Sequence, residues 1–280
     1  LSRNHADITI LLCVQRIYSY GKGKKKRKVV KLILGISDYY YLLCSVYYRH
    51  TDCYKLRKNY WCMKIFVTGG TGYIGSHTVV ELQQSGYDVI IADNLVNSSI
   101  DVLDGIEKIT GIRPEFEEID LTDRVTTRDF FIRHSDIEAV IHFAALKAVG
   151  ESVHKPLEYY FNNLNSLMNV LDAMREFQVP NLVFSSSCTV YGQADVLPVT
   201  EKTPRHEAES PYGNTKVMSE DIIRDLMKVE PNMNALALRY FNPIGAHPTA
   251  LIGELPNGVP NNLIPYLTQT AIGIREQLSV

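Results

Sequence analysis

Tyr212 and Lys216 stand four positions apart in a stretch whose Pro211 and apolar spacing predict a helix from Pro211 to about Val229. Side chains at this spacing lie on one face of a helix. A phenol with a pKa of about 10 is a poor base at neutral pH, but an ammonium group a few ångströms away favours the phenolate. The pair could therefore work as a general base and its electrostatic partner.

Three serines, Ser185-Ser186-Ser187, follow an apolar run from Leu182 that is typical of a buried strand. A Tyr-x-x-x-Lys spacing by itself is most often an exposed tyrosine and a helix-stabilising lysine, and serines at a strand end are most often caps. A hydroxyl at this strand end could nevertheless hand protons to a phenolate. The combination therefore favours proton transfer over the two structural interpretations.

A run of glycines follows the short β-branched strand predicted at residues 65–67 and leads into a predicted helix. Gly69 can take the tight turn, and Gly72 lets the backbone approach a pyrophosphate. Gly75 allows the helix to pack closely on the strand, and the helix N-terminus faces the anion. The alternative is a purely structural turn.

Asp93 follows the second predicted strand, residues 88–92. A carboxylate at this position can accept hydrogen bonds from both hydroxyls of an adenosine ribose and would repel a 2′-phosphate. The order of strand, glycines, helix, strand and acid is the context that distinguishes a dinucleotide site from an isolated glycine triplet. The sequence therefore predicts NAD as cofactor, in preference to NADP.

Strands and helices alternate along the rest of the chain. Further strands are predicted at residues 116–119, 139–144, 182–185 and 235–239. Helices are predicted at residues 100–109, 156–177 and 211–229, and another helix is predicted to begin after Asp123, which caps it. This alternation predicts an α/β fold with right-handed crossovers: a Rossmann-like, doubly wound parallel sheet that binds ligands at the carboxyl ends of its strands. We assign residues 63–241 to this domain.

Residues 242–280 differ in composition from the preceding domain: they are rich in Pro, Gly and Asn before a short helix predicted near residues 264–272. We interpret them as the beginning of a smaller lobe that covers the substrate. Another strand is predicted to begin near Val280. The lobe is therefore expected to be incomplete.

Residues 1–62 form a basic stretch without clear periodicity, with 13 Lys and Arg against 3 Asp, whereas the remainder has 16 Lys and Arg against 28 Asp and Glu. Met63 stands directly before the first predicted strand. We interpret residues 1–62 as a non-homologous extension, disordered or not native coding sequence. The alternative for the basic run 24–29 is a nuclear-import signal or nucleic-acid patch, but solvated charge is commoner, and no nucleic-acid partner is expected.

The cysteine pattern favours a reducing compartment, because four of the five cysteines precede Met63 and only Cys188 follows it. Lys31 and Asp38 interrupt the most apolar stretch, so no run reaches the roughly 18 residues of a membrane span. We expect a cytoplasmic protein with no membrane partner and no metal site.

The motifs G-G-T-G-Y-I-G-S-H, H-F-A-A-L-K-A-V-G-E-S, S-S-S-C-T-V-Y-G, P-Y-G-N-T-K, R-Y-F-N-P-I-G-A-H-P and P-N-N-L together resemble the UDP-glucose 4-epimerase family of extended short-chain dehydrogenases/reductases. The resemblance runs from Met63 to Val280 without a large gap, and nothing before Met63 belongs to it. The sequence departs from the commonest form at Ala145, where glycine is usual, and at Cys188, where alanine is usual. Neither change removes a reacting group.

The resemblance implies roles for individual residues. Tyr212 is similar to the catalytic base, Lys216 to its electrostatic partner and ribose ligand, and Ser187 to the hydroxyl that bridges Tyr212 and the sugar. The implied cofactor set also includes Gly69, Gly72, Tyr73, Ile74, Gly75, Asp93, Asn94, Asn97, Ser98, Asp120, Leu121, Phe143, Ala144, Lys147, Asn162 and Phe241. The implied nucleotide-sugar set adds Asn242, Asn262 and Leu263 to Ser187 and Tyr212.

The resemblance also implies a reaction that interconverts UDP-galactose and UDP-glucose in galactose metabolism, through a 4-keto sugar and tightly held NAD, in a homodimer. One alternative is a nucleotide-sugar 4,6-dehydratase, which needs an Asp-Glu pair where this chain has Cys188 and Thr189. Another is an NAD-binding fragment without turnover. Acceptance of N-acetylated sugars and the presence of a mutarotase domain stay open.

Overall fold

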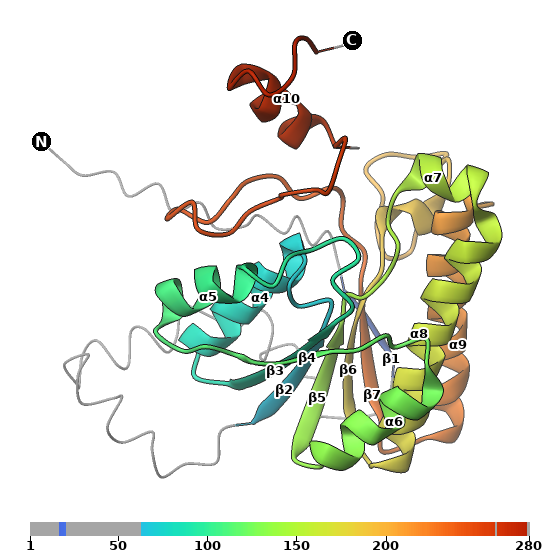
Figure 1. Cartoon of the computed structure of the whole chain (residues 1–280). Helices are drawn as coiled ribbons and strands as arrows, with labels where there is room; N and C mark the ends of the chain where they lie inside the picture. Colours follow the sequence, from blue (N-terminus) through green and yellow to red (C-terminus); the bar gives the residue numbers. More distant parts are fainter. Residues whose placement is uncertain (1–16, 21–62, 261, 279–280) are drawn as a thin grey trace, which may run out of the picture.

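The computed structural model describes residues 17–20, 63–260 and 262–278 (Figure 1). One sheet lies at its centre, with strands in the order β1-β7-β6-β5-β2-β3-β4. Every pair among β2 to β7 is parallel. The bounds are β2 Lys64–Thr68, β3 Asp88–Asp93, β4 Glu115–Glu118, β5 Ile137–His142, β6 Asn181–Ser185 and β7 Asn234–Leu238.

This strand order confirms the doubly wound parallel sheet. The chain runs outward from β2 through β3 to β4, then returns so that β5 lies on the other side of β2. The order reverses between β2 and β5, and in open parallel sheets the crevice for a ligand lies at the carboxyl ends of such a pair of strands.

Alternating side chains of the central strands face two separate cores. Ile65 and Val67 of β2 pack on one face, beneath α4 (Tyr73–Gln84) and α5 (Val102–Thr110). Phe66 points to the opposite face, which is covered by α6 (Arg124–Arg133), α8 (Pro156–Glu176) and α9 (Pro211–Val229). All five residues of β2 are buried, as expected for a strand covered on both sides.

The predicted elements agree with the structure to within about two residues at most ends. Asp123 caps α6 as expected, accepting hydrogen bonds from the backbone N–H groups of Val125 at 2.8 Å and Thr126 at 3.0 Å. The strand predicted to reach residue 144 ends at His142, because the backbone N–H of Phe143 turns toward Thr68. A short helix that was not predicted, α7 (Val149–His154), follows.

A seventh strand comes from residues 1–62, the stretch interpreted above as a disordered or non-native extension. β1 (Ile17–Tyr20) pairs antiparallel with β7 at the edge of the sheet. Without β1, the N–H and C=O groups along one side of β7 would have no strand partner. The sequence of β1, I-Y-S-Y, is rich in the residue types that strands favour.

The segment between β7 and α10 (Leu263–Ala271) crosses above α4 and α5 in Figure 1. Ile252 from this segment is buried in the core with Leu103 and Ile106 of α5. Gly105 makes the approach possible, since a Cβ there would lie 2.6 Å from the Leu251 carbonyl oxygen. The strand predicted to begin at Val280 lies outside the described residues.

Candidate active site

The glycine loop connects β2 to α4 at the crevice between β2 and β5. Gly69 has φ +66°, and a Cβ there would lie 2.8 Å from the Ala144 backbone nitrogen. A Cβ on Gly75 would lie 2.2 Å from the Gly69 carbonyl oxygen. These two glycines are therefore required by the packing of the loop itself.

Gly72 is the N-cap of α4, and no side chain caps the backbone N–H groups there. A Cβ on Gly72 would meet only one atom closely, the Gly69 carbonyl oxygen at 3.2 Å. Uncapped N–H groups and the helix dipole make this N-terminus suitable for an anion. Tyr73 and Ile74 begin the helix, and the Tyr73 hydroxyl donates to the Gly245 carbonyl at 2.8 Å.

Asp93 ends β3 beside this loop. Its Oδ2 accepts hydrogen bonds from Thr71 Oγ1 at 2.6 Å and the Thr71 backbone N–H at 3.3 Å. Its Oδ1 accepts from the Leu95 backbone N–H at 3.0 Å and Ser98 Oγ at 3.3 Å. A carboxylate offers about four acceptor sites, so a ribose at Asp93 would exchange places with one of these hydroxyls.

The other predicted cofactor residues fall into two groups. Asn94, Asn97, Asp120 and Phe241 are exposed, and the Asp120 side chain accepts a hydrogen bond from the Thr122 backbone N–H at 2.9 Å. Leu121 is buried in the core beneath them. Phe143 and Ala144 lie against the glycine loop, where both backbone N–H groups donate to Thr68 Oγ1 at 3.1 Å.

Asn163 holds the loop after β5 in place, although only its neighbour Asn162 was predicted as a site residue. The Asn163 amide bonds the Leu146 backbone twice, at 2.8 Å to N and 3.0 Å to O, and contacts Thr215 Oγ1 at 3.2 Å. Asn162 donates to the Asn163 side chain at 3.0 Å. No local pattern distinguishes Asn163 from the other asparagines of α8.

The predicted catalytic pair lies at the start of α9, where Ser210 caps the helix through the Gly213 backbone N–H at 3.1 Å. Lys216 is 4% exposed, and its Nζ donates to the Ser185 carbonyl at 2.8 Å. The same Nζ lies 5.7 Å from the centre of the Tyr212 ring. Burial lowers the pKa of Lys216 to about 8, against an opposing effect of the Glu220 carboxylate.

Tyr212 and Ser187 meet at the end of β6. Burial raises the pKa of Tyr212 to about 12, while a hydrogen bond with Ser187 acts in the opposite direction. The sequence-based expectation was that Lys216 would favour the phenolate. In the structure Lys216 binds the Ser185 carbonyl, and desolvation by burial is the largest influence on the pKa of the Tyr212 phenol.

Glu254 connects the predicted cofactor and nucleotide-sugar sets, although no sequence pattern singles it out. Its Oε1 accepts from Lys147 Nζ at 3.2 Å and from Asn262 Nδ2 at 2.5 Å. Asn242 and Leu263 are exposed, and the structure describes no hydrogen bond from either side chain. These two predicted substrate residues are therefore not tied to the catalytic group in the part of the chain described.

Two negative findings apply to residues 17–20, 63–260 and 262–278. They contain no group of three or more His, Cys, Asp or Glu side chains placed to hold a metal ion. None of their helices combines the length and apolar character needed to cross a membrane.

The sequence and fold of this chain are similar to those of UDP-glucose 4-epimerases. UDP-glucose 4-epimerases from Yersinia pestis and Mus musculus are each 51% identical to this chain, over 218 and 223 residues, and each match covers 78% of the chain and 64% of the relative. A UDP-glucose 4-epimerase structure from Bifidobacterium longum, in complex with NAD+ and UDP, superposes with a TM-score of 0.75 at 46% identity, covering 77% of this chain and 64% of that one. The chain thus spans less than two thirds of the length of these relatives.

Most of the chain also matches one protein family. Residues 65–272, which include the glycine loop, Asp93, the serine cluster and the Tyr212–Lys216 pair, match the NAD dependent epimerase/dehydratase family. The chain belongs to the NAD dependent epimerase/dehydratase family.

Proposed function

We propose that this protein is a UDP-glucose 4-epimerase that interconverts UDP-glucose and UDP-galactose with tightly bound NAD, in galactose metabolism. The observation that carries the proposal is the meeting of Tyr212, Lys216 and Ser187 at the end of β6, beside an uncapped glycine loop at the end of β2. The relatives at about 50% identity bear this name, which supports the same chemistry here.

The residues present fit a dinucleotide. The open N-terminus of α4 at Gly72 suits a pyrophosphate, and Asp93, with Ser98 and Thr71 around it, suits a ribose. We assign Lys216 as a ligand of a cofactor ribose. We assign the remaining contacts to Tyr73, Ile74, Asn94, Asn97, Asp120, Leu121, Phe143, Ala144, Lys147, Asn162 and Phe241.

The protein's own groups divide the chemistry between them. Tyr212 takes the proton of the sugar 4-hydroxyl and later returns it to the 4-oxygen, once the carbon-4 hydride has come back to the opposite face of the 4-keto sugar. Ser187 relays that proton and its hydrogen bond favours the phenolate, whereas Lys216, bound to the Ser185 carbonyl, places its charge 5.7 Å from the centre of the Tyr212 ring. Bound NAD supplies the acceptor and donor for the carbon-4 hydride, and its cationic ring adds to the field that favours the phenolate.

Cys188 and Thr189 favour epimerisation over 4,6-dehydration. Elimination needs an acid and a base beside the sugar, and these two positions follow Ser187 directly. Burial raises the pKa of the Cys188 thiol, so it stays neutral at neutral pH, and a threonine hydroxyl is a weak acid. Neither side chain replaces a carboxylate.

We also propose a homodimer formed through α8 and α9, which contact one another. Several large apolar side chains on these helices are exposed, among them Leu157 at 80% and Phe161 at 64%. A shallow groove between the two helices is lined by Met168, Leu171, Asp172, Arg175, Ile222 and Leu226. A second copy of the same face would cover this surface.

A cytoplasmic location fits the single cysteine of the described residues, Cys188, which is a free thiol. This location is a proposal that fractionation of the cells that make the protein would test.

Two measurements on the purified chain test the proposed enzyme. NAD binding is followed by calorimetry, and conversion of UDP-galactose is followed by a coupled assay for UDP-glucose. We expect NAD binding; conversion to UDP-glucose would support an epimerase, and loss of water from the sugar, found by mass spectrometry, would instead show a dehydratase. NAD binding without any conversion would favour a cofactor-binding module.

A further inference from the structure

Glu220 is a carboxylate with no exposed surface, one helical turn beyond Lys216 on α9. It belongs to neither the cofactor set nor the nucleotide-sugar set. Burying a charged carboxylate is unfavourable unless it is paired and hydrogen-bonded. Its partners therefore show what this position in the fold requires.

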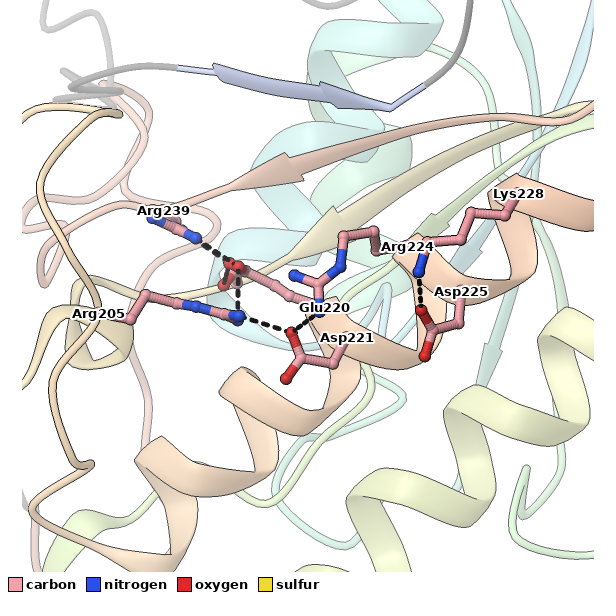
Figure 2. Close-up of polar contacts among 8 residues, drawn as sticks. Arg205, Glu220, Asp221, Arg224, Asp225, Lys228 and Arg239 are labelled. Atoms are coloured by element: carbon pink, nitrogen blue, oxygen red, sulfur yellow. Dashed lines mark hydrogen bonds and ion pairs between the residues drawn. The ribbon is translucent and has the colours of Figure 1, made fainter.

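Arg239 and Ser186 satisfy this carboxylate, and Figure 2 shows its contact with Arg239. Oε1 accepts hydrogen bonds from Ser186 Oγ at 2.6 Å and from Arg239 Nε at 2.8 Å, and Oε2 accepts from Arg239 Nη2 at 2.5 Å. Arg205 adds a longer contact, with Nη1 at 3.8 Å from Oε2. The Arg239 fork is bidentate, so it fixes the orientation of the carboxylate as well as its charge.

The bond to Ser186 holds the middle of the segment that forms the catalytic group. On one side, the Ser185 carbonyl accepts from Lys216 Nζ at 2.8 Å. On the other side, Ser187 meets the Tyr212 phenol. Tyr240, the residue after Arg239, reinforces the same segment, since its hydroxyl contacts Ser185 Oγ and its carbonyl accepts from the Cys188 backbone N–H at 3.1 Å.

The charges around Lys216 also single out Glu220. From its own helix Lys216 faces Tyr212 and Glu220. From β5 it faces His142, and burial lowers the pKa of His142 to about 3, so that imidazole is neutral. From β6 it faces the Ser185 carbonyl and the Phe184 ring. Among these described neighbours of Lys216, Glu220 is therefore the one that carries a negative charge at neutral pH.

We propose that Glu220 is a positioning residue for the epimerase reaction: through Ser186 and Arg239 it fixes the strand end that presents Ser185 to Lys216 and Ser187 to Tyr212, and its carboxylate places a negative charge one helical turn from the Lys216 ammonium. This inference rests on the proposed function. It assigns to Glu220 no contact with the sugar or the cofactor. Both effects act through other residues.

The first experiment compares Glu220→Gln with Asp225→Asn in the NAD-loaded chain. Both variants change a carboxylate of α9 to an amide, but Asp225 is exposed and pairs only with Lys228 at 2.6 Å, as Figure 2 also shows. We expect Glu220→Gln to lower kcat about tenfold to a hundredfold with little change in KM, the size that loss of alignment gives. Asp225→Asn should match the parent chain.

The pH profile of kcat distinguishes the effect of the Glu220 charge on Lys216 from the effect of Glu220 on the alignment of the serine segment. Loss of the Lys216 proton should produce a fall in kcat near pH 8 in the parent chain. Removing the anion lowers the pKa of Lys216, so the fall should begin at lower pH in Glu220→Gln. Ser186→Ala removes one hydroxyl and no charge, so it should lower kcat and leave the pH of the fall unchanged.

A measurement without turnover distinguishes this inference from the proposed function. The pKa of Lys216 is read from isotope-labelled lysine by NMR, with Lys216→Met to assign the signal, in the parent chain and in Glu220→Gln. A lower pKa in the variant supports the charge effect even if UDP-galactose is not converted, which would overturn only the proposed function. If UDP-galactose is converted but neither the Lys216 pKa nor kcat responds to Glu220→Gln, the inference is wrong.

Melting curves accompany each variant, because removing one charge of a buried pair can unfold a protein. If Glu220→Gln does not fold, Ser186→Ala carries the test. A normal kcat in Ser186→Ala would then contradict the alignment that we assign to this contact.

Discussion

In the proposed reaction, turnover depends most directly on Tyr212. We predict that Tyr212→Phe lowers kcat by at least about a hundredfold, the usual effect of removing a general base, while NAD binding persists. Tyr160→Phe is the control, since it removes a phenol that only accepts a hydrogen bond from Asn214 at 2.8 Å. Near-normal conversion of UDP-galactose by Tyr212→Phe would mean that another group takes the proton.

Asp93 should set the choice between NAD and NADP. We predict that Asp93→Asn weakens NAD binding about tenfold or more, because hydrogen bonds to a charged acceptor are among the stronger ones, and brings NADP affinity closer to NAD affinity. Calorimetric titration with both cofactors checks this. Equal affinity of the unaltered chain for the two cofactors would show that Asp93 does not discriminate between them.

The buried ammonium of Lys216 should lower the free energy of unfolding. The pKa of Lys216 is about 8 in the folded chain and 10.5 in the unfolded chain. Between pH 8 and pH 10.5 the unfolded chain therefore binds more protons, and the free energy of unfolding rises with pH. Below pH 8 the full cost is present. We predict that Lys216→Met raises stability by about 1 to 3 kcal/mol at pH 7, with a smaller gain at pH 10. A gain that does not depend on pH would contradict this origin.

At the scale of elements, the segment 246–253 is held by its contact with α5. We predict that Gly105→Ala loosens this segment, because a Cβ there would lie 2.6 Å from the Leu251 carbonyl oxygen. Gly150→Ala is the matched control, since a Cβ at that helical glycine meets nothing within 4 Å. Limited proteolysis should cut the segment faster in Gly105→Ala only. Equal cleavage of both variants would mean that the contact is dispensable.

The elements that the sequence predicted well are those with a periodic or continuous apolar signal. Runs such as I-F-V and V-I-I-A are buried on both faces, so composition alone identifies them as strands. α7 was missed because its six residues, V-G-E-S-V-H, are too short to show a helical period. β1 was missed because its pairing depends on the edge of β7, far along the chain.

The candidate site divides in the same way. Gly69, Gly75 and Asp93 could be predicted because local backbone geometry and a strand end define their roles. Glu220 follows a serine and precedes an aspartate, a pattern typical of a solvated helix face, and only its contact with Arg239 reveals that it is buried. Asn163 and Glu254 likewise act through partners distant in sequence.

At the scale of the whole molecule, the exposed apolar face of α8 should control assembly. We predict that the chain elutes as a dimer and that Phe161→Glu shifts it to a monomer, because a buried charge opposes association. Ile112→Glu is the control, since Ile112 is 43% exposed but lies at the end of α5, away from α8. Light scattering after size exclusion gives the masses. A monomeric parent chain would contradict the proposed dimer.

The insertion of β5 beside β2 has a consequence for the order in which the protein can assemble during synthesis. When the ribosome has released the chain as far as β4, the glycine loop and Asp93 are both present, but β2 still has one bare edge. That edge is covered only when β5 arrives, and the serine cluster is braced only when Arg239 and Tyr240 follow β7. A nascent chain can therefore acquire its nucleotide-binding loop well before it acquires a competent proton-transfer group, and in the interval its most exposed hydrogen-bonding edge is the centre of the future sheet.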